Sequence, residues 1–194
     1  MLISNTIDVE QPIEKVWAFF GDVPQVASCL PGAELTEDLG NDSYGGKVGI
    51  RMGPVKLQFD GKASILSRDE ANKTMVIDGA GAAEGGRGNA AMQLTARLQP
   101  APVGTKVNLD MDLQLSGAAA QYGRGMVQDV TKVLMGQFAT NMQRRIDAIE
   151  RGESLDSLGG AAPASGIAIA LQAAKLAISR VLRRFFLPYD AAKV

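Results

Sequence analysis

Three segments in the middle of the chain alternate apolar and polar residues with a period of two. The apolar residues occupy odd positions in 55–65 and 107–115 and even positions in 92–98. This period is typical of antiparallel strands with one wet face and one covered face. Shorter strands are predicted at 2–9, 33–37, 44–52 and 73–80, with turns rich in glycine, proline and asparagine between them.

A helical period marks the segments that would cover this sheet. Apolar residues repeat at helical spacing from about Ala119 to Ile149 and form one stripe. Pro12 opens an earlier helix that Gly21 ends, and a second short helix is predicted over 24–30. The order strand, two helices, about six strands and long helix predicts an α+β helix-grip fold. In this fold a curved antiparallel sheet of six or seven strands surrounds a long C-terminal helix.

Composition narrows the functions open to the chain. Its 194 residues are 46% hydrophobic and 21% charged, which is typical of a folded soluble protein. It has no histidine and one cysteine, which excludes histidine-based catalysis, disulfides within the chain and cysteine-cluster metal sites. The net charge of −1 gives no basic field for nucleic acid, so no nucleic-acid partner is expected.

Charge divides the chain into two unequal parts. Residues 1–154 carry 15 basic and 19 acidic residues, net −4, whereas residues 155–194 carry 5 and 2, net +3. Residues 151–166 are rich in glycine, serine and alanine, as flexible linkers are. We therefore predict a domain at 1–150, a linker at 151–166 and a separate tail at 167–194.

The tail has the pattern of a basic amphipathic helix. Its apolar residues gather on one side and its cations on the other, and no acidic residue lies between Asp156 and Asp190. This pattern is typical of a helix in the membrane interface, and a helix docked on a protein is the alternative. The expected membrane-binding residues are Lys175, Arg180, Arg183, Arg184, Phe185 and Phe186.

The sequence has neither a secretory signal pattern at its N-terminus nor an uncharged apolar stretch of 18 residues. Together with the tail, this predicts a peripheral protein on the cytoplasmic side of the cell membrane.

Three other features have simple structural interpretations. Cys29 has no neighbouring cation or histidine, so we expect a buried thiol. Asp110 and Asp112 share the wet face of one strand, where solvated carboxylates are expected rather than an acid/base pair. The glycine-rich segment 79–88 lacks the Lys-Ser/Thr pair of a phosphate loop, and we expect a hairpin there.

Several local motifs point to a known family. The segment from Pro12 to Glu34 reads PIEKVWAFFGDVPQVASCLPGAE, and CLPGAE is its most specific part. Gly53-Pro54 precedes a strand that ends in Phe59-Asp60-Gly61, the hairpin GAGAAEGGRGNA follows at 79–90, and Ser116-Gly117 leads into the long helix. Over residues 1–150 these motifs resemble the family of the carbon monoxide dehydrogenase G subunit, within the START/birch-pollen-allergen (SRPBCC) superfamily.

The resemblance implies a non-catalytic protein that recruits a molybdenum-containing CO dehydrogenase, or a related hydroxylase, to the cytoplasmic membrane. The superfamily implies an apolar cavity for a lipid-like ligand. Because such an enzyme must pass electrons to quinone in the bilayer, a menaquinone or ubiquinone is the ligand expected, with no covalent cofactor. Two alternatives remain: a tethering adaptor with a filled core, and a polyketide-cyclase-like enzyme, which would need an ionisable cavity.

In this architecture the strand residues that point inward face the apolar stripe of the long helix. A cavity is expected between them, and a solid core is the alternative. The 5% aromatic content, the 22 glycines and methionine at four inward positions favour a cavity. One of Tyr122, Gln128, Gln137 and Asn141 would contact a quinone head group. The expected cavity residues are Leu30, Ile50, Met52, Leu57, Phe59, Met92, Leu94, Met111, Leu113, Met126, Val130 and Leu134.

Overall fold

The computed structural model describes residues 1–52 and 55–154. The expected linker from residue 155 onward and the whole tail, with Lys175, Arg180, Arg183, Arg184, Phe185 and Phe186, lie outside the described residues. Seven strands form one antiparallel sheet in the order β1-β7-β6-β5-β4-β3-β2. They are β1 (Leu2–Val9), β2 (Ala33–Gly40), β3 (Ser43–Met52), β4 (Val55–Asp69), β5 (Thr74–Ala83), β6 (Asn89–Pro100) and β7 (Thr105–Leu115).

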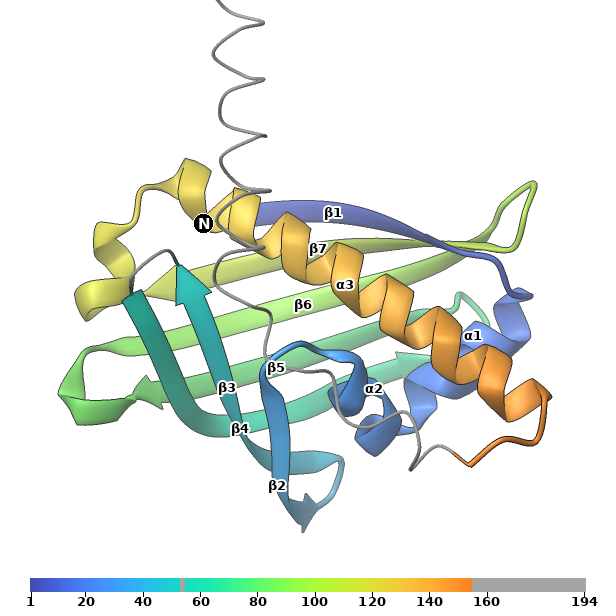
Figure 1. Ribbon diagram of the computed structural model, residues 1–194, viewed down its shortest axis with the longest axis horizontal. Helices are drawn as coiled ribbons and strands as arrows, with labels where there is room; N and C mark the ends of the chain where they lie inside the picture. The colour runs from blue at the N-terminus through green and yellow to red at the C-terminus, as the bar shows by residue number, and fades with distance from the viewer. Residues whose placement is uncertain (53–54, 155–194) are drawn as a thin grey trace, which may run out of the picture.

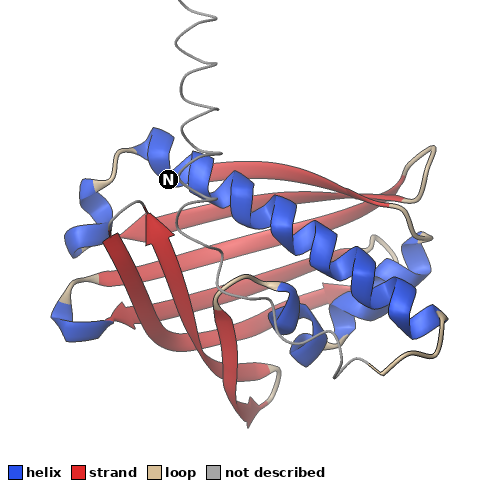
Figure 2. Ribbon diagram, viewed as in Figure 1, coloured by secondary structure: helices blue, strands red, loops and turns tan. Residues whose placement is uncertain are grey.

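Helices cover only one face of this sheet, which we call the inner face (Figures 1 and 2). The long helix α3 (Arg124–Glu150) lies across it, and α1 (Ile13–Gly21) and α2 (Val23–Cys29) lie near the C-terminal end of α3. Two 3₁₀ turns, η1 (Glu84–Gly86) and η2 (Gly117–Gln121), lie at the opposite end. The helix-grip fold predicted from the sequence is confirmed. None of the helices in the described ranges is long and apolar enough to cross a bilayer.

The long helix starts later than its apolar pattern predicted. The sequence indicated a helix from about Ala119, but 117–121 is a 3₁₀ turn and α3 begins at Arg124. Gly123, with a ψ of 153°, is extended and separates the two segments. Glycine is a poor helix former, so the break falls at the position where continuing the helix would gain least.

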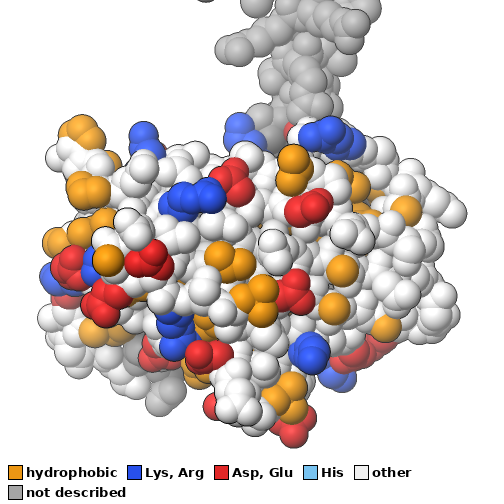
Figure 3. Space-filling model, turned by 180° about the vertical axis from the view of Figure 1, so that it is seen from behind, with side chains coloured by type: hydrophobic (Ala, Val, Ile, Leu, Met, Phe, Trp, Pro, Cys, Tyr) orange, Lys and Arg blue, Asp and Glu red, His pale blue; other side chains and the backbone are white. Residues whose placement is uncertain are grey.

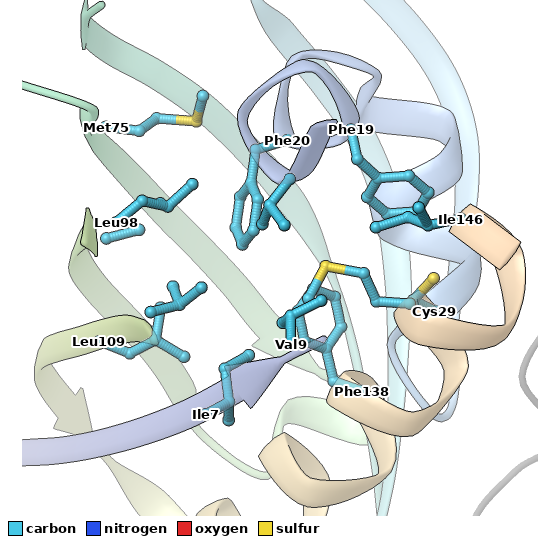
Figure 4. Close-up of a cluster of buried hydrophobic side chains, with 14 residues drawn as sticks. Ile7, Val9, Phe19, Phe20, Cys29, Met75, Leu98, Leu109, Phe138 and Ile146 are labelled. Atoms are coloured by element: carbon cyan, nitrogen blue, oxygen red, sulfur yellow. The ribbon is translucent and has the colours of Figure 1, made fainter. Parts of the chain in front are cut away.

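The period-two alternation correctly predicted which side chains face the helices. Val107 and Leu109 of β7 are buried, whereas Lys106 and Asp110, on either side of this pair, are exposed. A first cluster of buried side chains lies beneath α1, α2 and the C-terminal half of α3 (Figure 4). Within it the rings of Phe20 and Phe138 meet edge to face, with centroids 6.3 Å apart. Its members are Ile7, Val9, Val16, Phe19, Phe20, Cys29, Met75, Ala96, Leu98, Val107, Leu109, Phe138, Met142 and Ile146.

A second, smaller cluster closes the other end of the inner face. It joins the start of β4 to η2 and to the N-terminal half of α3. Its buried members are Leu57, Phe59, Ala83, Ala119, Val130 and Val133. The middle of the inner face lies between the two clusters.

Candidate ligand-binding site

Strand register places a row of very small residues across the middle of the inner face. Gly46, Gly61, Gly81 and Ala90 are successive cross-strand partners from β3 to β6, and the row ends at Leu115 of β7. We call these four residues the glycine row. The glycine row lies between the residues of the two clusters. On one side the neighbouring row contains Phe59 and Ala83 of the second cluster, and on the other side, further along β5 and β6, lie Met75 and Ala96 of the first cluster. The sheet therefore projects almost no side chain toward α3 at this level.

Close backbone contacts explain why glycine occupies two of these positions. A Cβ atom on Gly61 would collide with the carbonyl oxygen of Ala80, and one on Gly46 would lie 2.9 Å from the carbonyl oxygen of Glu34. Only residues without a side chain let neighbouring strands approach in this way. The glycines thus allow β3 and β4 to bend over the inner face, as Figure 1 shows.

The next row contains a methionine that lies over a glycine. Gly79 of β5 is the partner of Met92 of β6, and a Cβ on Gly79 would be 3.1 Å from the Met92 Cε atom. The flexible methionine side chain therefore occupies the space that Gly79 leaves. A thioether chain with three rotatable bonds can move out of such a space at low cost when a ligand enters.

Burial falls along β6 and β7 as they pass this level. Ala96, Leu98, Val107 and Leu109 are at most 5% exposed. Further along the inner face of the same two strands, the side chains are only half-buried, although neither strand is at an edge of the sheet. We call these residues the half-covered section: Met92, Leu94, Met111 and Leu113. Apolar side chains on such strands that still touch solvent indicate that α3 does not seal this part of the inner face.

Four polar residues of α3 and the segment before it were expected to offer a contact to a head group. Asn141 donates a hydrogen bond from Nδ2 to the carbonyl oxygen of Cys29, 3.0 Å away, and so joins α3 to α2. Gln137, one turn earlier, is half-buried, and no hydrogen bond connects its side chain to another residue of the described ranges. Its amide is therefore available to a ligand, while Asn141 has a structural partner. Tyr122 packs against the second cluster, and Gln128 is half-buried.

The structure distributes the predicted cavity residues among three places. Leu57, Phe59 and Val130 belong to the second cluster, and Ile50 and Leu134 pack against it. Leu30 and Leu94 pack against the first cluster. Met92, Met111 and Leu113 belong with Leu94 to the half-covered section, and the Met52 side chain lies outside the described residues.

One predicted position is wrong in its orientation. Met126 was expected to face inward, but it is 42% exposed in the first turn of α3. Val127 and Val130 take the buried positions there. Ile149, at the other end of the expected stripe, is also on the surface.

Sequence reasoning missed a buried cation beside Cys29. Arg145 is 7% exposed and donates from Nη1 to Oε1 of Gln25 at 2.9 Å, which fixes α2 to α3. In the sequence, Arg144 and Arg145 look like two ordinary surface charges. Only the position of Arg145 relative to the apolar stripe of the helix could have indicated that it faces inward. Burial raises the pKa of the Cys29 thiol to about 11, although the positive charge of Arg145 and a hydrogen bond with Ser28 oppose the shift.

The outer face carries scattered charges of both signs (Figure 3). Asp110 accepts hydrogen bonds from Ser4 and Arg97, each at 2.7 Å, and these hold its pKa below the ordinary range. Asp112 pairs with the N-terminal amine of Met1. Both carboxylates are exposed and face away from the half-covered section, so the expectation of a solvated face is confirmed.

Comparison with known families agrees with this geometry. The model of the family of the carbon monoxide dehydrogenase G subunit (CoxG) matches residues 6–147. The chain belongs to this family. No curated protein matches the chain in sequence.

Solved structures show that the CoxG-family chain shares its fold with a wide group of proteins. A conserved protein of Geobacillus kaustophilus is 21% identical, with a TM-score of 0.68 over 76% of this chain and 95% of that one. The aromatase/cyclase ZhuI of Streptomyces sp. R1128 is 15% identical, with a TM-score of 0.54 over 79% and 99%. At these identities the likeness concerns the fold alone.

Proposed function

We propose that the protein is a non-catalytic, membrane-associated carrier that holds a quinone or a similar lipid against the half-covered section. In this proposal it serves a molybdenum-containing carbon monoxide dehydrogenase, or a related hydroxylase, at the cytoplasmic membrane. The observation that carries the proposal is the half-covered section itself, an apolar surface left open beneath α3 in a chain of the CoxG family.

The chemistry of this region suits a quinone. A quinone has an apolar tail and a head group with two carbonyl oxygens that accept hydrogen bonds. The half-covered section would bury the tail by the hydrophobic effect, and the free amide of Gln137 can donate to a carbonyl oxygen. Methionines 92 and 111 would adapt to the ligand shape, since methionine side chains fill irregular space readily.

A ligand carrier also has a chemical reason to work with such an enzyme. Oxidation of CO releases two electrons, and a quinone takes up two electrons with two protons. Quinones dissolve in the bilayer and hardly in water, so a protein that shields one from water would bring it to an enzyme outside the bilayer. The basic tail would supply the membrane contact.

The test is to purify the full chain without detergent, extract it with organic solvent and identify the extract by mass spectrometry. We expect a quinone or another lipid at close to one molecule per chain. A chain that folds but yields no lipid, and takes up none from quinone-containing vesicles, would favour the tethering adaptor. A bound compound that the isolated protein converts into a new product would favour the cyclase-like enzyme. Co-purification with the dehydrogenase tests the partner.

A further inference from the structure

Two basic side chains lie directly opposite each other near the end of the β3–β4 ladder. Arg51 of β3 and Lys56 of β4 are cross-strand partners, and both are exposed. Like charges at such positions destabilise a strand pair. Lys47, four residues before Arg51, instead pairs with its partner Asp60. Within residues 1–52 and 55–154, Arg51 and Lys56 have no ion-pair partner.

Further cations lie at the same end of the molecule. Arg87 follows η1, and its carbonyl oxygen accepts a hydrogen bond from the amide of Ala118 in η2, 2.8 Å away. Arg124 is the first residue of α3, whose first turn has no acidic residue and whose N-cap makes no side-chain hydrogen bond. Because the helix dipole is already positive there, a cation is unfavourable for the helix. Glu84 of η1 offsets one of these charges.

The segments that carry these four cations meet at one end of the molecule, and Arg51 and Lys56 reach its surface from the outer face, because their neighbours Ile50 and Leu57 face inward. The second cluster joins Leu57, the residue after Lys56, to Ala119 of η2 and to Val130 of α3. In Figure 1 the end of the β3–β4 ladder, η1 and η2 lie together at the left-hand end. We call this surface, with Arg51, Lys56, Arg87 and Arg124, the basic end. The Arg51–Lys56 pairing and the placement of Arg124 both lower the stability of the fold. Both also raise the positive electrostatic potential at the basic end.

Exposed apolar side chains accompany the cations. Arg124 donates from Nη2 to the carbonyl oxygen of Leu2, 3.1 Å away, and Leu2 is 67% exposed. Met126, two residues further along α3, is 42% exposed. Acidic residues are more numerous elsewhere, in and beside the turns after β1, β2 and β4, although Glu14 and Asp42 pair there with Lys73 and Arg68. These acidic residues are Glu10, Glu14, Asp38, Asp42, Asp69 and Glu70. The domain is therefore acidic overall but basic and partly apolar at one end.

We propose that the basic end is a docking surface for an anionic lipid bilayer. Cations around exposed apolar side chains match the interface, where headgroups are negative and side chains such as Met126 can insert. Docking there would turn the domain end-on to the membrane and place the N-terminal end of α3 against it. The inference rests on the proposed function, because it gives the proposed carrier a fixed orientation at the membrane. It adds a membrane contact of the domain to the membrane contact of the tail.

The experiment uses the full chain and vesicles of phosphatidylcholine with 0, 20 or 40% phosphatidylglycerol. The variant Arg51→Gln/Lys56→Gln removes the opposed charges, and Lys106→Gln/Arg144→Gln removes two exposed charges far from the basic end as a matched control. Each cation near an anionic surface strengthens binding by about fivefold. Because the first variant removes two such cations, we expect it to bind 40% phosphatidylglycerol roughly 25-fold more weakly and the control to bind within twofold of the wild type.

Two further measurements keep the inference separate from the carrier proposal. Removing opposed like charges should leave the urea midpoint of unfolding unchanged or raise it, and the lipid extracted from the protein should be unaffected. Equal vesicle binding by the wild type and by Arg51→Gln/Lys56→Gln would overturn the docking surface and direct attention to an acidic protein. A lower midpoint would also overturn it, because the pair would then serve the fold.

Discussion

The side chain of Met92 lies over Gly79, its partner on the neighbouring strand, and its Cε and Cγ atoms would be 3.1 and 3.3 Å from a Cβ placed there. In the proposed carrier, this contact would limit how much of the inner face is free for a ligand. With glycine at 79 the methionine can lie flat against β5. A side chain at 79 would push it toward α3.

Gly79→Ala should therefore reduce ligand binding and leave the fold nearly unchanged. The backbone of Gly79 needs no positive φ, and alanine is better than glycine in a strand by about 0.5–1 kcal/mol, which offsets the displacement of a flexible side chain. We expect weaker quinone uptake at an unfolding free energy within about 1 kcal/mol of the wild type. The double variant Gly79→Ala/Met92→Ala should recover uptake. If it does not, the pair does not limit the site.

A glycine of the bent strands should respond very differently. Gly61→Ala places a Cβ against the carbonyl oxygen of Ala80, and two backbones must separate to admit it. We expect a loss of about 3 kcal/mol in urea unfolding, at the upper end of overpacking effects. Gly136→Ala is the matched control, because a Cβ there meets nothing within 4 Å on α3. It should gain about 1 kcal/mol. A Gly61→Ala protein as stable as the wild type would show that the bend does not depend on glycine.

The Cys29 thiol should make stability depend on pH in the alkaline range. Burial raises its pKa from 9.0 to about 11, so the unfolded chain loses its proton first as pH rises. The stability that the neutral buried thiol contributes to the fold is therefore complete below pH 9 and is lost between about pH 9 and 11. The wild type should lose about 1 kcal/mol relative to Cys29→Ala between pH 8 and pH 10. Urea unfolding of both proteins measures the difference, and parallel curves would mean that the thiol is not buried in solution.

Some of this structure could be predicted from the sequence, and the reasons differ between regions. Strands β4 and β7 were predictable because their outer face is wet, which forces polar residues such as Asp110 to alternate with apolar ones. The glycine row was not, because Gly46, Gly61 and Gly81 come together only through the register of three strands.

The same reasoning explains the error at Met126. Apolar spacing alone could not decide between Met126 and Val127, because they lie four and three residues before Val130 and both spacings fit one helix face; the structure buries Val127. The role of the half-covered section in ligand binding stays a prediction. Its four residues could be expected to face inward, but their partial exposure depends on how α3 lies over the sheet.

The tail should be the main membrane anchor. Its cations would add roughly 1 kcal/mol each at an anionic surface, and the attraction should weaken as salt rises. Truncation after Gly160 should leave the domain folded and weaken its binding to anionic liposomes strongly, to the level that the basic end alone supports. Reversing the charges of Arg180, Arg183 and Arg184 should do nearly the same. If the truncated chain co-sediments as well as the full chain, the tail is not the anchor: the basic end then holds the domain on the liposomes, and docking on a partner becomes the better interpretation of the tail helix.

The central claim is that the half-covered section holds the ligand, and titration with a short-chain quinone tests it most directly. Met111→Trp should fill the section from β7, while Met126→Trp makes the same change on the surface. Circular dichroism should show that both variants are folded. We predict quinone binding by the wild type and Met126→Trp, and a loss of tenfold or more in affinity for Met111→Trp. Equal affinity of Met111→Trp and the wild type, or no binding by either, would contradict the account.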